Sequence, residues 1–237
     1  IEFALRHIPE PLILDEAQVL PAVFPVIRSL IDEIRRKNGR FILLGSVNPE
    51  LVKHISESLA GRVGIVELTP FLFQEIADFR KTGLHDLWLG GGFPEAFLTR
   101  KPEKREAWLE NYVRTFIERD IARHGLSTSA LEMRRFMGMV AHVHGGMINA
   151  SDLGRSLGCS YHAVQRILDL LEGYFLIRRL PPYYANLGKR LVKASKLYIR
   201  DTGILHYLLG IHTEADLLQS PSRGNSFEGF MIEQITA

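Results

Sequence analysis

The first seventy residues alternate between short apolar runs and amphipathic stretches. Apolar runs over 11–14, 40–44 and 63–68 are typical of buried strands, because strands covered on both faces of a parallel sheet read as continuous hydrophobic segments. The stretch 22–37 repeats apolar residues at the helical period, and the stretch 48–60 opens with a capping asparagine and a proline. The order strand, helix, strand, helix, strand predicts half of a parallel α/β sheet.

Two adjacent carboxylates, Asp15 and Glu16, follow the first apolar run. Open α/β sheets bind ligands outside the carboxyl ends of their strands, which is where these acids are expected. In P-loop NTPases two acids at this position form the Walker B motif, in which the first holds Mg²⁺ through its water shell and the second polarises the attacking water. The alternative interpretation is a strand that ends at a polar loop.

The middle of the chain, from residue 70 to about 129, reads as helices and loops. The segment 103–121 is a long amphipathic helix whose aromatic stripe belongs to a core. A glycine-rich segment, 91–97, precedes a short helix, and we interpret it as a structural turn rather than a phosphate-binding loop.

Beyond residue 130 the pattern changes to that of a helix-turn-helix followed by two strands. A helix, a short capped helix, a glycine turn and a longer helix capped by Ser160 follow one another, and an apolar pair of strands comes next. The predicted elements are helices over 135–144, 149–158 and 161–173 and strands over 175–180 and 196–199. This order predicts a winged helix.

The strings LILDEAQ, FILLGSV and SESLAGRVGIVELTPFLFQEI resemble the AAA-type ATPases of bacteria and archaea. In the group that the whole chain resembles, the ATPase core precedes a C-terminal domain of unknown function that combines a winged helix with a restriction-endonuclease-like fold. The resemblance implies an α/β fold with a partial parallel-sheet ATPase core, then a helical lid and a winged helix-turn-helix, mostly α overall. The implied domains are the C-terminal half of the core (1–70), the lid (71–128), the winged helix (129–200) and the start of the endonuclease-like domain (201–237).

The same resemblance assigns roles to two further residues. Ser46 falls at the sensor 1 position, where a polar side chain contacts the γ-phosphate, although a Gly-Ser after a strand is also a common turn. Arg62 falls where such ATPases place an arginine finger, and a planar guanidinium suits the charge that builds on phosphoryl oxygens. The alternative for Arg62 is a surface arginine that closes a helix C-terminus.

One departure from the family pattern is the absence of a P-loop. No G-x-x-x-x-G-K-[ST] occurs in the sequence, so nothing in it cradles the α- and β-phosphates of ATP. The chain also begins at Ile1 rather than at a methionine. We therefore interpret it as a fragment without its nucleotide-binding half, which by itself should not hydrolyse ATP.

A second set of residues suggests contact with double-stranded DNA. From residue 178 to residue 200 the chain carries seven cations and no acid, and tyrosines are interleaved among them. Such density fits phosphate contacts by the wing, although many winged helices bind proteins and a basic strand pair is often only a solvated face. The candidate DNA-binding residues are Tyr161, His162, Gln165 and Arg166 on the second helix and Arg178, Arg179, Lys189, Arg190 and Lys193 in the wing.

Composition narrows the function classes. The 237 residues are 46% hydrophobic, which fits a globular protein. The formal net charge is only +2, so the distribution of charge along the chain is more informative than the total. No apolar run approaches the ~18 residues of a membrane span. The single Cys159 fits a reducing cytoplasm. His142 and His144 would lie on different faces of a helix, so we expect no metal site beyond Mg²⁺ at Asp15.

Together these features favour an ATP-driven, DNA-associated switch. ATP and Mg²⁺ would bind between neighbouring subunits of a homo-oligomer, with Asp15 and Glu16 on one subunit and Arg62 from the next. Two alternatives stay open. The chain could be a DNA-binding or protein-recruitment module on an inert ATPase scaffold. It could also belong to a nucleotide-regulated nuclease, although Glu228 alone cannot assemble a metal centre for phosphodiester cleavage.

Overall fold

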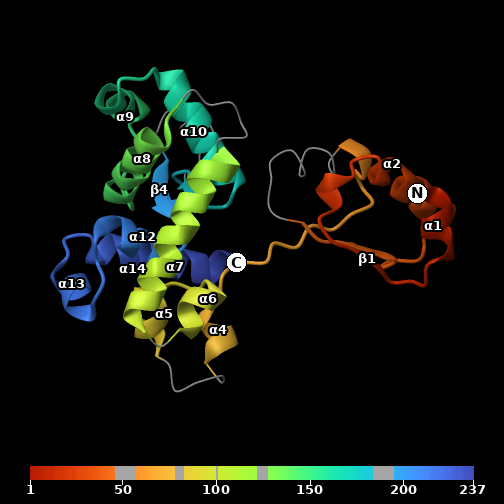
Figure 1. Cartoon of the computed structure of the whole chain (residues 1–237), viewed down its shortest axis with the longest axis horizontal. Helices are drawn as coiled ribbons and strands as arrows, with labels where there is room; N and C mark the ends of the chain where they lie inside the picture. The colour runs from red at the N-terminus through yellow and green to blue at the C-terminus, as the bar shows by residue number, and fades with distance from the viewer. Residues whose placement is uncertain (46–56, 78–82, 100, 122–127, 184–194) are drawn as a thin grey trace. The chain divides into compact units, whose positions relative to one another are not determined.

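A computed structural model describes residues 1–45, 57–77, 83–99, 101–121, 128–183 and 195–237 (Figure 1). Helices predominate among them and the strands are short, in agreement with the expectation of a mostly α chain. The chain divides into two compact units, residues 1–66 and 67–237. No helix in the described ranges combines the length and the apolar character needed to cross a membrane.

The first unit contains a two-stranded parallel sheet and one main helix. Strands β1 and β2 pair in parallel with Leu12 opposite Phe41, and helix α2 connects them. This strand, helix, strand order confirms the first part of the predicted α/β pattern. The elements are α1 (Glu2–His7), β1 (Leu12–Leu14), the 3₁₀ turn η1 (Ala17–Val19), α2 (Val23–Glu33) and β2 (Phe41–Leu43).

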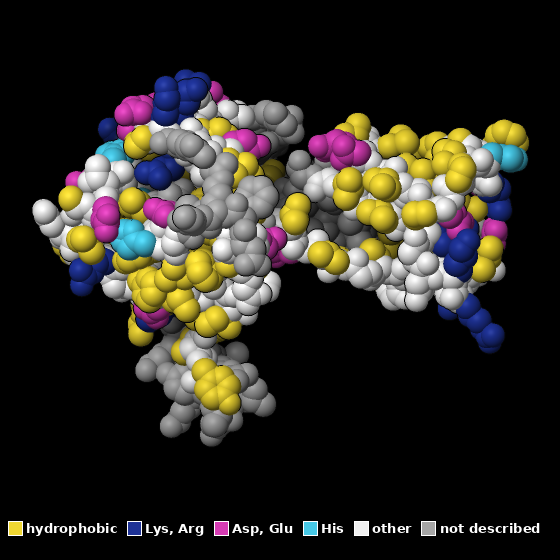
Figure 2. Space-filling model, turned by 90° about the horizontal axis from the view of Figure 1, so that it is seen from below, with side chains coloured by type: hydrophobic (Ala, Val, Ile, Leu, Met, Phe, Trp, Pro, Cys, Tyr) yellow, Lys and Arg dark blue, Asp and Glu magenta, His cyan; other side chains and the backbone are white. Residues whose placement is uncertain are grey.

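The core of the first unit lies on one face of this sheet. The buried side of α2 packs there because its apolar residues recur at the helical period. On the opposite face Ile13 and Ile42, which are partners in the register, are 57% and 43% exposed. Figure 2 accordingly shows hydrophobic side chains over much of the visible face of this unit. The core residues are Ala17, Val23, Phe24, Ile27 and Leu59, with Leu5, Leu14, Ile31, Phe41 and Leu43 packed against them.

Two predictions for the first unit were wrong. Residues 63–68 form no strand, and Val66 and Leu68 are 92% and 95% exposed. An apolar run becomes a strand only where a neighbouring strand supplies hydrogen bonds, and none does so among the described residues. Helix α2 ends at Glu33 rather than at residue 37, and Arg40 donates from Nη1 to the carbonyl of Leu30 at 2.5 Å in its last turn.

The second unit begins with short helices that lead into a long one. Pro94 and Pro102 stand at the first positions of their helices, where the missing N–H costs nothing. The long amphipathic helix was predicted over 103–121, and its last six residues form a π-helix. The elements are α4 (Phe73–Ile76), α5 (Leu84–Gly90), α6 (Pro94–Leu98), α7 (Pro102–Thr115) and the π-helix η2 (Phe116–Ile121).

Three helices and a pair of strands follow, in the order that the pattern predicted. Asn149 and Ser160 cap the second and third helices with their side chains, and Gly158 takes the left-handed conformation in the turn between them. The strands pair antiparallel with Ile177 opposite Ile199. The elements are α8 (Ala130–His142), α9 (Ala150–Leu157), α10 (Tyr161–Gly173), β3 (Ile177–Leu180) and β4 (Lys196–Ile199).

Three helices complete the second unit: α12 (Thr202–Leu209), α13 (Glu214–Gln219) and α14 (Arg223–Thr236). Helix α12 packs against α5, α7, α8 and α14 and is therefore central to the unit. Ser226 lies within the last helix and does not cap it. Ser226 is fully buried one turn inside α14, and its Oγ lies 2.9 Å from Trp88 Nε1 and 2.7 Å from His206 Nε2.

The glycine turn before α6 is fixed by a buried carboxylate. Asp201 accepts hydrogen bonds from the backbone N–H of Gly92 at 2.8 Å and of Ile204 at 2.9 Å. Gly91 has φ +76°, and a Cβ there would lie 2.5 Å from Asp201 Oδ1. Burial raises the pKa of Asp201 to about 6. This confirms a structural role for the turn, which holds α5 against the start of α12.

Candidate functional site

The acid pair lies at the carboxyl edge of the parallel strands, as predicted. The N–H of Leu44 donates to the carbonyl of Leu14 at 2.8 Å, and the N–H of Ala17 donates to the carbonyl of Leu44 at 3.1 Å. These bonds hold the segment that contains Asp15 and Glu16 beside the end of β2. Both acids are exposed, so their carboxylates are accessible to a ligand from solvent.

The backbone at the acid pair is unusual. Glu16 has φ 49° and ψ 42°, a left-handed conformation that costs a non-glycine residue roughly 1–2 kcal/mol. Asp15 supports the turn, because its Oδ1 accepts a hydrogen bond from the N–H of Glu16 at 2.9 Å. Strained backbone of this kind concentrates at functional sites, where surrounding structure holds a side chain in place.

The carboxylates of Asp15 and Glu16 would provide part of a Mg²⁺ site. Carboxylate oxygens are the hard ligands that Mg²⁺ prefers, and one or two carboxylates with several waters are its usual protein environment. The phosphate cradle is missing, since the sequence has no P-loop. Ser46, which the resemblance assigns to sensor 1, lies outside the described residues. Leu44 and Gly45 precede it directly, so the described chain reaches this edge of the sheet.

Arg62 is held by a carboxylate from α2. Its Nε and Nη2 donate to the two oxygens of Asp32 at 2.8 and 3.0 Å, and its Nη1 donates to the carbonyl of Ala60 at 2.9 Å. The hydrogen bond from Arg62 lowers the pKa of Asp32 to about 2. This two-point contact fixes the plane of the guanidinium, which a single point charge would not do.

Arg62 and the acid pair lie at opposite edges of the sheet. The side chain of Arg40, just before β2, donates to the carbonyl of Leu30, so the last turn of α2 and its Asp32 lie at the amino edge of the strands. A strand rises about 3.3 Å per residue, so the path from there to Leu44 covers about 13 Å. The first unit therefore does not bring Arg62 to Asp15 and Glu16.

The predicted DNA-contacting helix presents an exposed polar face. Tyr161, His162 and Arg166 are exposed on α10, while the inward-facing residues of the same helix are buried. Gln165 is half-buried and donates from Nε2 to the hydroxyl of Tyr161 at 3.2 Å. No carboxylate within the described ranges forms an ion pair with Arg166. These side chains are therefore available for contacts outside the chain.

The predicted wing cations Arg178 and Arg179 already have partners. Arg178 donates to both oxygens of Glu233 on α14, at 2.5 and 2.9 Å. Arg179 donates to Glu172 and Asp169 on α10, both at 2.7 Å. The absence of acids in their own segment was misleading, because the preceding helix α10 and the helix α14, 55 residues from Arg178, supply the carboxylates. Contact of these two residues with DNA stays a prediction, and it would require each guanidinium to leave a carboxylate.

Lys196 and Arg200 also have carboxylate partners. Lys196 donates to Glu228 at 2.8 Å, and Arg200 contacts both Glu233 at 2.8 Å and Glu67 at 2.5 Å. In Figure 2 basic and acidic side chains lie next to each other on the visible face of the second unit. Outside the described residues lie the predicted contacts Lys189, Arg190 and Lys193.

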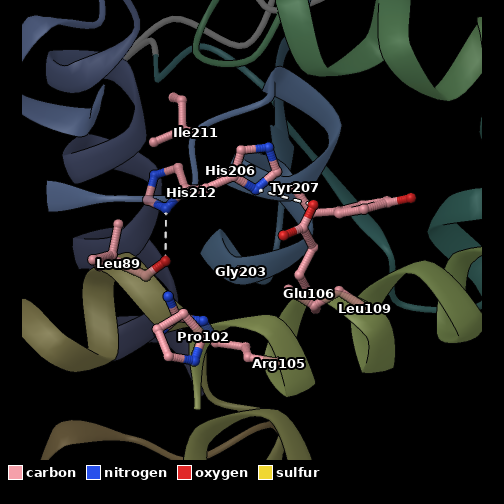
Figure 3. Close-up of a pocket in the computed structure, with 10 residues that line it drawn as sticks. All are labelled: Leu89, Pro102, Arg105, Glu106, Leu109, Gly203, His206, Tyr207, Ile211 and His212. Carbon is pink, nitrogen blue, oxygen red and sulfur yellow. Dashed lines mark hydrogen bonds and ion pairs between the residues drawn. The ribbon is translucent and has the colours of Figure 1, made fainter. Parts of the chain in front are cut away.

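A small pocket of the second unit lies between α7 and α12 (Figure 3). Two histidines line it: His206 Nδ1 donates to the carbonyl of Leu89 at 2.9 Å, and His212 Nδ1 faces Glu106 at 3.5 Å. Its volume of about 30 Å³ holds about two water molecules. None of the predicted site residues lines this pocket, and it is too small for a nucleotide.

The histidines of the predicted H-x-H pair do not converge. His142 Nδ1 donates to the carbonyl of Gly138 at 2.8 Å on its own helix. His144 is buried, accepts from the N–H of Ile199 at 3.0 Å and donates to the carbonyl of Asn225 at 3.1 Å. Burial lowers the pKa of His144 to about 4, so the ring is neutral. In the part of the chain that the structure describes, no three His, Cys, Asp or Glu residues gather as metal ligands.

Sequence reasoning missed three structurally important carboxylates. Asp32 and Glu233 each hold arginines that are 30 or more residues away in the chain, and Asp201 holds the glycine turn. For Asp32 the sequence contains one local signal, since Arg28 and Arg35 stand at helical spacing from it. For Glu233 and Asp201 no local pattern identifies the partner, because the contact exists only after the helices pack.

Two family models match different parts of the chain. Residues 81–215 match the model of a family described as a domain of unknown function, DUF8612, and residues 2–77 match an AAA domain. The second match supports an AAA-like ATPase region. An uncharacterized protein of Mycobacterium tuberculosis and one of Mycobacterium bovis are each 42% identical over 234 residues, or 99% of this chain and 52% of each relative. The chain thus spans about half the length of these relatives. No solved structure matches it.

Proposed function

Since the chain belongs to the family of the domain of unknown function DUF8612 and its first residues match an AAA domain, we propose that it acts as a nucleotide-driven, DNA-associated switch. The observation that carries this proposal is the exposed pair Asp15 and Glu16 at the carboxyl edge of a parallel strand pair, inside the segment that matches the AAA domain. Paired acids at this edge are what Mg²⁺-dependent phosphoryl chemistry requires of a sheet.

Asp15, Glu16 and Arg62 have different roles in the proposed hydrolysis. Asp15 holds the hydrated metal in place, and Glu16 orients the attacking water and accepts its proton. Bound Mg²⁺ and ATP supply the polarised terminal phosphate. Arg62 lies at the other edge of its own unit, so it serves a nucleotide on a neighbouring subunit of a homo-oligomer. The phosphate cradle comes from outside the segment that this chain contains.

The winged helix-turn-helix carries the DNA contact in this proposal. Tyr161, His162 and Arg166 at the exposed side of α10 contact the duplex in this proposal, since all three are exposed and no described carboxylate forms an ion pair with Arg166. The strand-pair arginines support the wing instead, since Glu233 and Glu172 neutralise them. Among the described residues, Arg166 on α10 is thus the cation that this proposal assigns to the duplex.

ATP hydrolysis by the intact protein tests the first half of the proposal. Turnover should depend on Mg²⁺, rise with double-stranded DNA and fall by about 10² or more in Glu16→Gln, because the attacking water loses its orienting group. Glu103→Gln, an exposed acid on α7, is the matched control and should retain turnover. Absence of turnover with DNA binding retained would leave a binding module on an inert scaffold, and DNA cleavage would favour the nuclease alternative.

Duplex binding measured by fluorescence anisotropy tests the second half. Replacing Arg166 by alanine should weaken binding and reduce the slope of log K against log salt by about 1, as expected for one lost phosphate contact. Arg114→Ala on α7, whose guanidinium contacts Asn111 on the same helix, is the control. Equal salt slopes for the two variants would remove α10 from the DNA interface.

A further inference from the structure

Asp32 contacts more than one arginine. Besides the two bonds from Arg62, it accepts from Arg35 at 2.9 Å and lies 4.0 Å from Arg28. Among the described residues three guanidinium groups therefore share this carboxylate, so the cations of the cluster outnumber its acid. The arginines at 28 and 35 are 52% and 66% exposed, so their charge faces solvent.

Arg62 differs from its two neighbours in how firmly it is held. Its side chain is only 18% exposed, and it makes three hydrogen bonds, two to Asp32 on α2 and one to the carbonyl of Ala60. A guanidinium carries more N–H donors than these three contacts use. The two-point contact with Asp32 fixes the plane of the guanidinium, and with it the plane in which the remaining donors lie.

Arg6, in the same unit, shows the opposite ratio of cations to acids. Arg6 contacts two carboxylates, Glu2 and Glu33, so its charge is more than balanced. At Asp32 the ratio is reversed, with several cations on one acid. An ordinary surface ion pair contributes little and has no need of such an excess, whereas an anion site depends on it.

We propose that Asp32 is the positioning residue for Arg62 and that Arg28, Arg35 and Arg62 together bind the terminal phosphate of a nucleotide held by a neighbouring subunit. This inference rests on the proposed function, which supplies the nucleotide, and adds the residues that receive it. Asp32 sets the direction of the fork before the phosphate arrives, so the arginine does not lose side-chain freedom at that moment. The two exposed arginines add attraction over a longer range.

The test compares variants of the intact protein in ATP hydrolysis. Asp32→Asn should lower kcat about 10-fold or more with KM changed by less than about 2-fold, because misplacement of a transition-state group affects the chemical step. Glu33→Gln, the adjacent acid on α2 that contacts Arg6 instead, is the matched control and should keep full turnover. Arg62→Lys should resemble Asp32→Asn, since lysine cannot make the fork.

Mixing subunits separates a role across the interface from a general loss of structure. Asp32→Asn and Glu16→Gln subunits should each be nearly inactive alone, yet a 1:1 mixture should recover turnover at about a quarter of the sites, where an intact Glu16 meets an intact neighbour. Absence of recovery, or full kcat in Asp32→Asn while Glu16→Gln is inactive, would overturn the inference and leave the proposed function standing. Inactivity of the unmodified protein would overturn both.

A titration of this chain with inorganic tripolyphosphate gives a readout that needs no turnover. The Arg Nε–H resonances of the three arginines should shift together in NMR spectra, and Asp32→Asn should broaden the signal of Arg62 before any ligand is added. A short DNA duplex is the second ligand. If the duplex shifts these resonances and tripolyphosphate does not, the phosphate comes from DNA and the nucleotide assignment is wrong.

Discussion

Replacing Asp201 by alanine tests whether the glycine turn is held by this buried carboxylate. The side chain is fully buried, and its oxygens accept from the N–H groups of Gly92 and Ile204 at 2.8 and 2.9 Å, with a further backbone bond from Gly203. All three donors belong to buried residues. Alanine removes every acceptor at once and leaves these N–H groups without a partner inside the unit.

The expected cost follows from these contacts. A buried donor that loses its acceptor costs about 1–3 kcal/mol, and loss of a helix cap costs about 0.5–2 kcal/mol. Because the losses overlap at the start of α12, we expect a decrease of about 3–5 kcal/mol in the free energy of unfolding of the second unit. This is a large share of the roughly 5–15 kcal/mol that stabilises a domain.

The pH dependence gives a second test at Asp201. Burial raises its pKa in the folded state from 3.8 to about 6. A raised pKa means that the folded state binds the proton more tightly, so the associated stability is present below pH 4 and is lost as the pH rises to about 6. Two pKa units correspond to about 3 kcal/mol. Relative to Asp201→Asn, which does not titrate, the protein should lose about this much between pH 4 and pH 7.

Urea unfolding of this chain, followed by circular dichroism at several pH values, measures both effects. Asp216→Ala is the control, since Asp216 also accepts backbone hydrogen bonds at the start of a helix, from His212 and Thr213, but is exposed, and its effect should be much smaller. Equal urea midpoints for Asp201→Ala and the unmodified chain would show that the turn does not depend on this carboxylate. A pH-independent difference from Asp201→Asn would refute the direction of the pKa shift.

Three further predictions concern the second unit. A Cβ at Gly203 would lie 2.4 Å from the carbonyl oxygen of Gly90, so Gly203→Ala should lower stability by about 1–3 kcal/mol in urea unfolding, whereas Gly224→Ala, with open space around it, should not. His144 should stay neutral above about pH 5, so its ring resonances in NMR spectra should move only near pH 4, and a midpoint near 6.5 would contradict its burial. Glu233→Ala should lower the melting temperature because it leaves two part-buried arginines without their shared carboxylate, and an unchanged value would mean that these ion pairs add nothing.

The helices of the second unit could be predicted from local signals. The caps Asn149 and Ser160 and the glycine at 158 define α9 and α10, and the inward positions of α10 repeat at the helical period. These features depend on residues that are close together in the sequence, so they can be recognised before the tertiary structure is known. The strand pair was predicted for the same reason, apart from small differences at its ends.

The charged surface could not be predicted in this way. Seven cations without an acid between residues 178 and 200 predicted a basic face, but α10 and α14 bring Glu172 and Glu233 against two of them. Charge balance depends on distance in space, since a carboxylate 55 residues away in the chain neutralises a guanidinium as well as an adjacent one does. For this reason our proposal assigns DNA contact to α10 rather than to Arg178 and Arg179.

The sequence by itself determined most of the described helices and strands, and it placed Asp15 and Glu16 at the end of a strand. An apolar run that stops at Asp15 and Glu16 places the acids at the end of a strand, because a strand continues only as far as its apolar side chains can be covered. Only the tertiary structure decided that 63–68 forms no strand and that Arg62 lies at the opposite edge, held by Asp32. A strand needs a neighbouring strand that supplies hydrogen bonds, and Arg62 needs a carboxylate within reach. Packing decides which of these groups lie close together, and no local pattern in the sequence encodes those distances.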